Sequence, residues 1–332
     1  MAFPVATSGT TPPLYPVGSV SNTFSAQGYI PEIWSGKLIE KFYASTVLAA
    51  ISNTDYEGEI KGHGDKVHIR TKPTITIRPY MADGNLQVER PVGAKIVLNI
   101  DQGQYFNTIL DDVMRIQSDI NLMSMWSDDA AEQMKIVIDR AVLLSLLGQA
   151  TATTNRGVTA GAISASINLG KTTAPLSLVA TGATGGQVDV LNMILRLGQA
   201  LDEQNIPETG RWIVVPTWVA TLIKRSDLRQ AYLSGDAVSI LRNGRLGMID
   251  RFTIYTSNLL PKGAITGLAA NEYVVYAGHQ HGFTFASQMT NMETLRSEMT
   301  FGQLMRGLQV YGSQVIDATA LAEAIVVKDA AA

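Results

Sequence analysis

Apolar side chains recur every three or four residues between Ser118 and Gln149, and this is the longest helical pattern in the chain. Such spacing places the apolar positions on one face of a helix. The segment contains no proline, and no glycine before Gly148. We therefore predict one long helix; a break near Ser127, which could cap a second helix, is the alternative. The predicted buried face consists of Met123, Trp126, Ala130, Met134, Val137, Ala141 and Leu144, and the predicted solvent face of Asp128, Glu132, Lys135 and Asp139.

A two-residue alternation replaces the helical period between residues 59 and 110. Apolar and polar side chains alternate in KVHIRTKPTITIRPY and again in LQVERPVGAKIVLNIDQ, as they do in strands. The pair Asp83-Gly84 between the two runs is a strong signal for a tight reversal. Pro73 and Pro79 interrupt the first run, so we predict an edge strand or a projecting ribbon rather than a central strand. Because an isolated two-stranded ribbon is marginally stable, we expect this one to lie on another surface.

Shorter patterns predict the remaining elements. Residues 1–29 are rich in Gly, Ser, Thr and Pro, which indicates either a disordered tail or an extended arm whose aromatic side chains dock elsewhere. Residues 150–186 read as a long irregular segment. The predicted helices are Pro31–Ile51, Gln187–Gln204 and Thr217–Lys224, and the predicted strands are Arg211–Val215, Tyr273–Ala277, Phe283–Ser287 and Gly307–Val315.

Composition narrows the class of protein. Of 332 residues, 46% are hydrophobic and only 17% are charged, which suits a chain that buries its surface against copies of itself. A net charge of −3 without a basic stripe argues against a dedicated nucleic-acid binder. The absence of cysteine excludes disulfides, thiol catalysis and thiolate metal sites. No run approaches about 18 apolar residues and the N-terminus lacks a signal-peptide pattern, so we expect a soluble protein with no membrane partner.

Patterns that carry catalysis or metal binding are weak. His279 and His281 point the same way if they lie on a strand, but no third ligand is near, so a turn is the simpler interpretation. Gly182–Gly186, with Lys171 upstream, lacks the order of a phosphate-binding loop. Neighbouring acids such as Asp111 and Asp112 diverge on a helix, and no nucleophile elbow occurs. The sequence therefore indicates no catalytic residue, no metal site and no cofactor.

The order of segments resembles a known family. An arm and a short helix precede a hairpin containing GDKVHIRTKP, its return KIVLNIDQGQYFNTILDDV, and the helix SDINLMSMWSDDAAEQMKIVIDRAVL; later segments are GRWIVVPTWVATLIKRSDLRQA and MRGLQVYGSQVIDATALAEAIV. Together these are similar to the major capsid protein of tailed bacteriophages. The resemblance implies an α+β, Hong Kong-type phage capsid fold. It divides the chain into an N-terminal arm (1–30), a helix leading into the peripheral domain (31–58), an extended β-hairpin loop (59–100), a peripheral domain with a long spine helix (101–150), an axial α/β domain (151–290), and return strands of the peripheral domain with the C-terminus (291–332).

The resemblance also implies a function. It predicts a shell subunit that self-assembles, as hexamers and pentamers, into an icosahedral head enclosing double-stranded DNA. An encapsulin-like compartment shell and an α/β enzyme with an unrecognised site are the alternatives. Implied partners are other copies, separate scaffolding, portal and cement proteins, and DNA held by weak non-specific contact; the implied location is the virion, after synthesis in the host cytoplasm. No charged coiled segment precedes the arm and no lysine and asparagine pair for crosslinking is identified. The candidate subunit-interface residues, all on the ribbon, are Arg70, Lys72, Arg78, Tyr80, Arg90 and Lys95.

Overall fold

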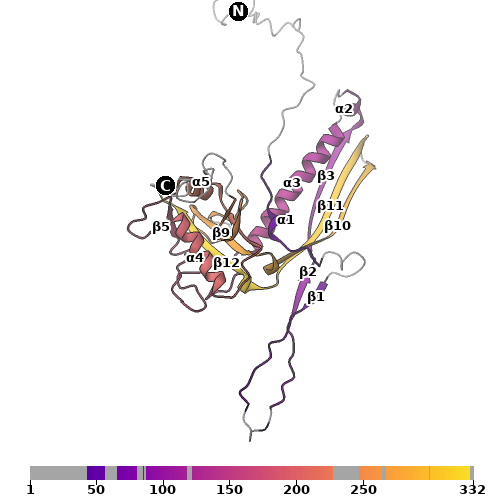
Figure 1. Ribbon diagram of the computed structural model, residues 1–332. Helices are drawn as coiled ribbons and strands as arrows, with labels where there is room; N and C mark the ends of the chain where they lie inside the picture. The colour runs from indigo at the N-terminus through magenta and orange to yellow at the C-terminus, as the bar shows by residue number, and fades with distance from the viewer. Residues whose placement is uncertain are drawn as a thin grey trace, which may run out of the picture. The chain divides into compact units, whose positions relative to one another are not determined.

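The computed structural model describes residues 43–56, 66–80, 85, 87–117, 122–226, 247–263, 267–298 and 300–329 (Figure 1). The chain divides into two units, residues 1–42 and 43–332, and every described residue belongs to the second. The predicted arm, most of the predicted helix Pro31–Ile51 and the turn at Asp83-Gly84 lie outside the described residues. None of the described helices is both long enough and apolar enough to cross a membrane.

The described part of the chain combines helices with three sheets, as an α+β fold does. The α-helices are α1 (Leu48–Ile51), α2 (Asp112–Gln117), α3 (Leu122–Ser145), α4 (Val190–Asp202) and α5 (Thr217–Arg225), and short 3-10 turns are η5 (Gln280–Gly282) and η6 (Ala318–Ala320). The strands are β1 (Lys66–Arg70), β2 (Lys95–Asn99), β3 (Gln102–Asp111), β4 (Leu176–Val179), β5 (Gln187–Asp189), β6 (Arg211–Val215), β7 (Met248–Ile249), β8 (Phe252–Thr256), β9 (Glu272–His279), β10 (Phe283–Arg296), β11 (Gly302–Val315) and β12 (Leu321–Lys328).

A seven-stranded mixed sheet, in the order β5-β4-β12-β9-β6-β8-β7, is covered by apolar side chains on both faces. In β6, Ile213 and Val215 pack with α4, whereas Trp212 and Val214 pack with α3, as strand alternation requires. The predicted apolar face of α4 is buried. The helix starts at Val190, later than predicted, because residues 187–189 form β5.

A three-stranded antiparallel sheet, in the order β10-β11-β3, lies beside α3 (Figure 1). The family resemblance implied that residues 291–332 are return strands of the peripheral domain, the domain that would also hold the long helix. Strand β11 does lie here, but β12 does not: it pairs with β4 and β9 in the seven-stranded sheet. The first six residues of β12 are buried, and a strand with both faces buried needs a central position in a covered sheet.

Helix α3 is unbroken, but its buried face differs from the predicted one. The alternative break at Ser127 is not observed. Val137 and Leu144, predicted to be buried, are 46% and 38% exposed, whereas Ile138, Val142 and Leu143 are buried. This end of the helix is apolar nearly all round, so helical spacing alone did not define one face. Contact with the seven-stranded sheet does: the Tyr276 hydroxyl donates to the Leu143 carbonyl oxygen at 3.0 Å.

Asp139, predicted to face solvent, is 1% exposed and holds the start of α1. Its two carboxylate oxygens accept hydrogen bonds from the backbone amides of Val47 at 3.3 Å and Leu48 at 3.0 Å. The first amides of a helix have no partner within it, and this carboxylate supplies one. Residues 43–47 are not helical, so the predicted helix Pro31–Ile51 is wrong over that stretch. Burial raises the pKa of Asp139, against the two amide hydrogen bonds, which lower it.

Candidate interaction surface

The base of the ribbon is a two-stranded antiparallel pair that is anchored by a small apolar cluster. Strands β1 and β2 pair from Lys66 opposite Asn99 to Arg70 opposite Lys95. Ile69 and Leu98 are buried and pack with Ile100 and Ala286, the last of which belongs to β10. The alternating positions in β1 and β2 therefore fix which side of the ribbon faces the protein.

Beyond this base the ribbon has no regular strand pairing in its described residues. The ladder ends where Thr71 donates its backbone amide to the Ala94 carbonyl oxygen at 3.0 Å. Further out, the Glu89 carboxylate accepts 3.4 Å hydrogen bonds from the amide and the hydroxyl of Thr76. The strand predicted through residues 71–80 is not formed. Proline lacks the amide that a ladder needs, which is consistent with a strand that ends before Pro73.

The distal ribbon exposes large apolar side chains. Their exposed fractions are 63% for Ile75, 90% for Ile77, 79% for Tyr80, 91% for Val88 and 88% for Val92. Single exposed apolar residues are ordinary on protein surfaces, but a concentration on one projecting segment is typical of an interaction site.

The predicted interface residues are all exposed. Arg70 and Lys95 lie opposite each other across the ladder, a like-charge pairing that is unfavourable by itself. The other four predicted residues are Lys72, Arg78, Tyr80 and Arg90. Within the described part of the chain, none of these six side chains forms an ion pair or a hydrogen bond. The ribbon thus presents exposed apolar groups, together with cations that form no ion pair with any other described residue.

Two further apolar surfaces were not identified from the sequence. On the three-stranded sheet, the register aligns Leu295, Leu304 and Ile109 in one row, with Tyr105 exposed nearby on β3. The second surface lies at one end of this sheet, where α2 meets the β10–β11 turn. There the backbone amide of Asp112 donates a 3.0 Å hydrogen bond to the carbonyl oxygen of Phe301. The side chains exposed there are Val113, Met114, Ile116 and Phe301. The short apolar run DVMRIQ was the available signal, but a six-residue helix gives too little periodicity to assign a face.

A loop beside α4 presents Ile163, which is 81% exposed. The Glu203 carboxylate accepts hydrogen bonds from the amides of Ile163 at 2.8 Å and Ser164 at 3.0 Å. Desolvation, the largest single contribution, raises the pKa of Glu203, but these hydrogen bonds, together with those from the side chains of Ser164 and Gln199, outweigh it and bring the pKa to about 2. The loop is therefore held in place at neutral pH by an ionised carboxylate.

Of the two histidines considered for metal binding, His279 forms a hydrogen bond with the local backbone. His279 Nδ1 accepts a hydrogen bond from the His281 amide at 3.1 Å and so closes the turn η5. In the described ranges, no three or more His, Cys, Asp or Glu residues gather where they could hold a metal ion.

Known proteins resemble this chain in sequence and in fold. Residues 98–324 match the model of a family described as phage capsid protein. The chain belongs to this family. A sequence search among curated proteins finds no match. Among solved structures, the chain is similar to one from Mycobacterium phage Che8, at 25% identity and a TM-score of 0.71, over 90% of this chain and 97% of that chain.

More divergent capsids have the same fold. The capsid structure of cyanophage P-SCSP1u is 16% identical with a TM-score of 0.68, over 97% of this chain and 100% of that chain. A capsid of a native GTA particle is 16% identical with a TM-score of 0.62, over 93% of this chain and 100% of that chain. The Hong Kong-type capsid fold implied by the sequence is thus confirmed. This capsid protein is a shell subunit of a phage head and part of the virion, and the encapsulin-like alternative is not favoured.

Proposed function

We propose that the ribbon of this capsid protein is a contact by which one subunit holds the next in the shell. The observation that carries the proposal is the concentration, among the described residues of 70–95, of exposed apolar side chains and of cations that form no ion pair with another described residue. A projecting segment whose described apolar side chains are this exposed gains stability when a neighbour covers it.

The chemistry of the ribbon suggests what the neighbouring surface offers. Arg70 and Lys95 repel each other across the ladder, so an acidic group from another subunit would relieve this repulsion. The apolar positions Ile77 and Val88 require an apolar acceptor. We propose that the row of Leu295, Leu304 and Ile109 on another copy, in which Leu295 and Ile109 are exposed, contributes to it.

Removal of the distal ribbon tests this role. The two ends of Thr74–Val92 already approach each other, since a Cβ on Gly93 would lie 3.7 Å from Pro73 Cδ. An Asn-Gly turn can therefore replace the segment. We expect a soluble, folded chain, by circular dichroism and melting temperature, that forms no particles in electron micrographs. Particles of normal size and yield would refute the proposal.

Charge reversal gives a milder version of the same test. Arg78→Glu combined with Arg90→Glu should reduce particle yield less than the deletion, because an exposed ion pair contributes only about 0 to 1 kcal/mol. Lys328→Glu, an exposed basic position on β12, is the control and should assemble normally. Equal yields of the double variant and the control would argue that the ribbon's charges do not contribute.

We further propose a structural, non-catalytic role with hexamers and pentamers as assembly units, after synthesis in the host cytoplasm. In this proposal the chain is divided into a peripheral domain and an axial domain. Separate scaffolding, portal and cement proteins are its partners. DNA would be held by weak contact, since the net charge is −3. Fluorescence anisotropy should show sequence-independent binding of unassembled subunit to duplex DNA that disappears between about 50 and 200 mM salt. A footprint on one defined sequence would contradict this part of the proposal.

A further inference from the structure

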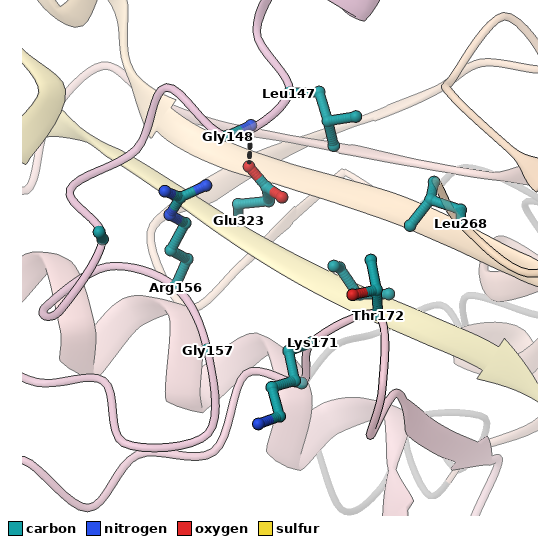
Figure 2. A pocket seen from close by; sticks show the side chains of 11 residues that line it. Leu147, Gly148, Arg156, Gly157, Lys171, Thr172, Leu268 and Glu323 are labelled. Carbon is teal, nitrogen blue, oxygen red and sulfur yellow. Dashed lines mark hydrogen bonds between the residues drawn. The ribbon is translucent and has the colours of Figure 1, made fainter. Parts of the chain in front are cut away.

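A pocket lies against β12, on the face of the seven-stranded sheet that α3 covers (Figure 2). Its volume is about 370 Å³, within the range of small-ligand sites. The turn after α3 contributes Leu147 and Gly148, and two loops contribute Arg156 and Lys171. Leu268 and Ile325 give it an apolar side. No part of the proposed ribbon contact lies here.

Three charged side chains line this pocket, and their charges do not cancel. They are Arg156, Lys171 and Glu323. The Glu323 carboxylate is 3% exposed and accepts a hydrogen bond from the Gly148 amide at 2.8 Å. Burial raises the pKa of Glu323, while the Gly148 amide and the charge of Arg156 act in the opposite direction. With Glu323 ionised the walls carry one net positive charge, and with Glu323 protonated they carry two.

The Arg156 guanidinium is half-buried and has no hydrogen bond or ion pair with any other described residue. Figure 2 shows it beside the Glu323 carboxylate, whereas Lys171 extends away from both. A guanidinium presents a planar fork of donors that fits the two oxygens of a carboxylate. Its donors face a cavity that is large enough to hold such a group.

Hydrogen bonds from the neighbouring residues hold the backbone around Arg156 in place. The preceding residue, Asn155, is fully buried and donates its side-chain amide to the carbonyl oxygens of Thr319 at 2.6 Å and Leu321 at 2.7 Å. The Asn155 carbonyl oxygen accepts a hydrogen bond from the Glu323 amide at 3.0 Å. Gly148 has a φ of +74°, and a Cβ there would lie 2.8 Å from Arg156 Nη1. The loop, β12 and the glycine therefore form one rigid wall.

We propose that this pocket binds the carboxylate of an aliphatic acid through the Arg156 guanidinium, with the aliphatic part against Leu268 and Ile325. The carboxylate balances the excess positive charge, and the apolar side of the pocket receives the hydrocarbon. An acidic side chain of a neighbouring protein in the shell and a free organic acid share this chemistry.

Ligand-observed NMR with sodium butyrate as the probe tests the site on the full-length unassembled subunit. Butyrate should bind, and the neutral isostere butyramide should bind far more weakly. Arg156→Gln should weaken butyrate binding about 10- to 100-fold, because it removes a charge-assisted pair of hydrogen bonds. Arg140→Gln is the matched control, since Arg140 is exposed and lies on α3 outside this pocket; it should bind as the unmodified chain does.

Glu323→Gln separates a carboxylate site from a site for a cation. The glutamine oxygen still accepts from the Gly148 amide, while the negative charge is removed, so butyrate should bind at least as tightly. Binding is compared among variants whose melting temperature equals that of the unmodified subunit. Absence of butyrate binding by the unmodified subunit at about 10 mM, equal binding by Arg156→Gln, or loss of binding in a folded Glu323→Gln variant would overturn the proposal.

Assembled particles then distinguish the two sources of the carboxylate. If a neighbouring protein supplies it, butyrate that binds the free subunit should not bind the particle, and Arg156→Gln particles should dissociate at lower temperature. If the ligand is a free acid, particles should bind butyrate as subunits do. The binding assay on unassembled chains does not depend on the ribbon contact, so failure of one proposal leaves the other standing.

Discussion

Asp139 allows the energetics of the α1–α3 junction to be tested directly. Its carboxylate is 1% exposed and is the hydrogen-bond acceptor for two backbone amides, at 3.3 and 3.0 Å. Those amides belong to Val47 and Leu48, which are only 5% and 9% exposed. Water therefore has little access to them if the carboxylate is removed, and both donors would be left without partners.

Asp139→Ala should destabilise the subunit by about 2 to 4 kcal/mol. Two hydrogen bonds to a charged acceptor contribute about 1.5 to 3 kcal/mol each, and the cost of burying the carboxylate, which raises its pKa, offsets part of this sum. Asp139→Asn keeps one acceptor oxygen but turns an amide donor toward the second backbone amide, so we expect an intermediate loss of about 1 to 2 kcal/mol.

Urea unfolding of the unassembled subunit, followed by tryptophan fluorescence, measures these changes. Glu132→Ala on the same helix is the matched control: its 2.6 Å ion pair with Lys135 joins side chains that are 43% and 59% exposed. That substitution should change the free energy of unfolding by less than about 0.5 kcal/mol. If Asp139→Ala is as mild as Glu132→Ala, the assignment of Asp139 as the partner of the α1 amides is refuted.

Further substitutions test other parts of the fold. Leu143→Ala should cost about 2 to 5 kcal/mol and Leu144→Ala less than about 1 kcal/mol in the same unfolding assay, because the first side chain is fully buried and the second is 38% exposed. Arg211→Ala should cost about 1 to 3 kcal/mol and lower the melting temperature, since this fully buried side chain donates to the carbonyl oxygens of Ile206 at 2.6 Å and Pro207 at 2.8 Å, whereas its partner Asp202 is 39% exposed. The carboxylate of Glu203, with a pKa of about 2 against an ordinary 4.5, stabilises the fold above pH 4.5. This contribution should disappear as pH falls from 4.5 to 2, and Glu203→Gln should lack that part of the acid-dependent fall in melting temperature; an identical pH profile would contradict the assignment.

Where one period runs through a segment, the sequence alone determined the element. The apolar face of α4 follows from a regular pattern over more than three turns, and β6 follows from five consecutive residues bounded by Gly210 and Pro216. The long helix and the ribbon base were also predicted, as was the family implied by their order. These features depend on residues that are close together along the chain, so their pattern can be recognised in the sequence.

Tertiary contacts decided what local periodicity left open. The apolar end of α3 offered two faces, and packing against β9 chose the one that buries Asp139. Strand β12 lies in the seven-stranded sheet because partners on both sides bury it, and those partners are distant in sequence. Arg156 and Glu323 likewise line the same pocket because β12 lies beside the loop after α3. Burial of a charge and pairing of a strand depend on groups far apart in the chain, so the folded structure was needed to assign them.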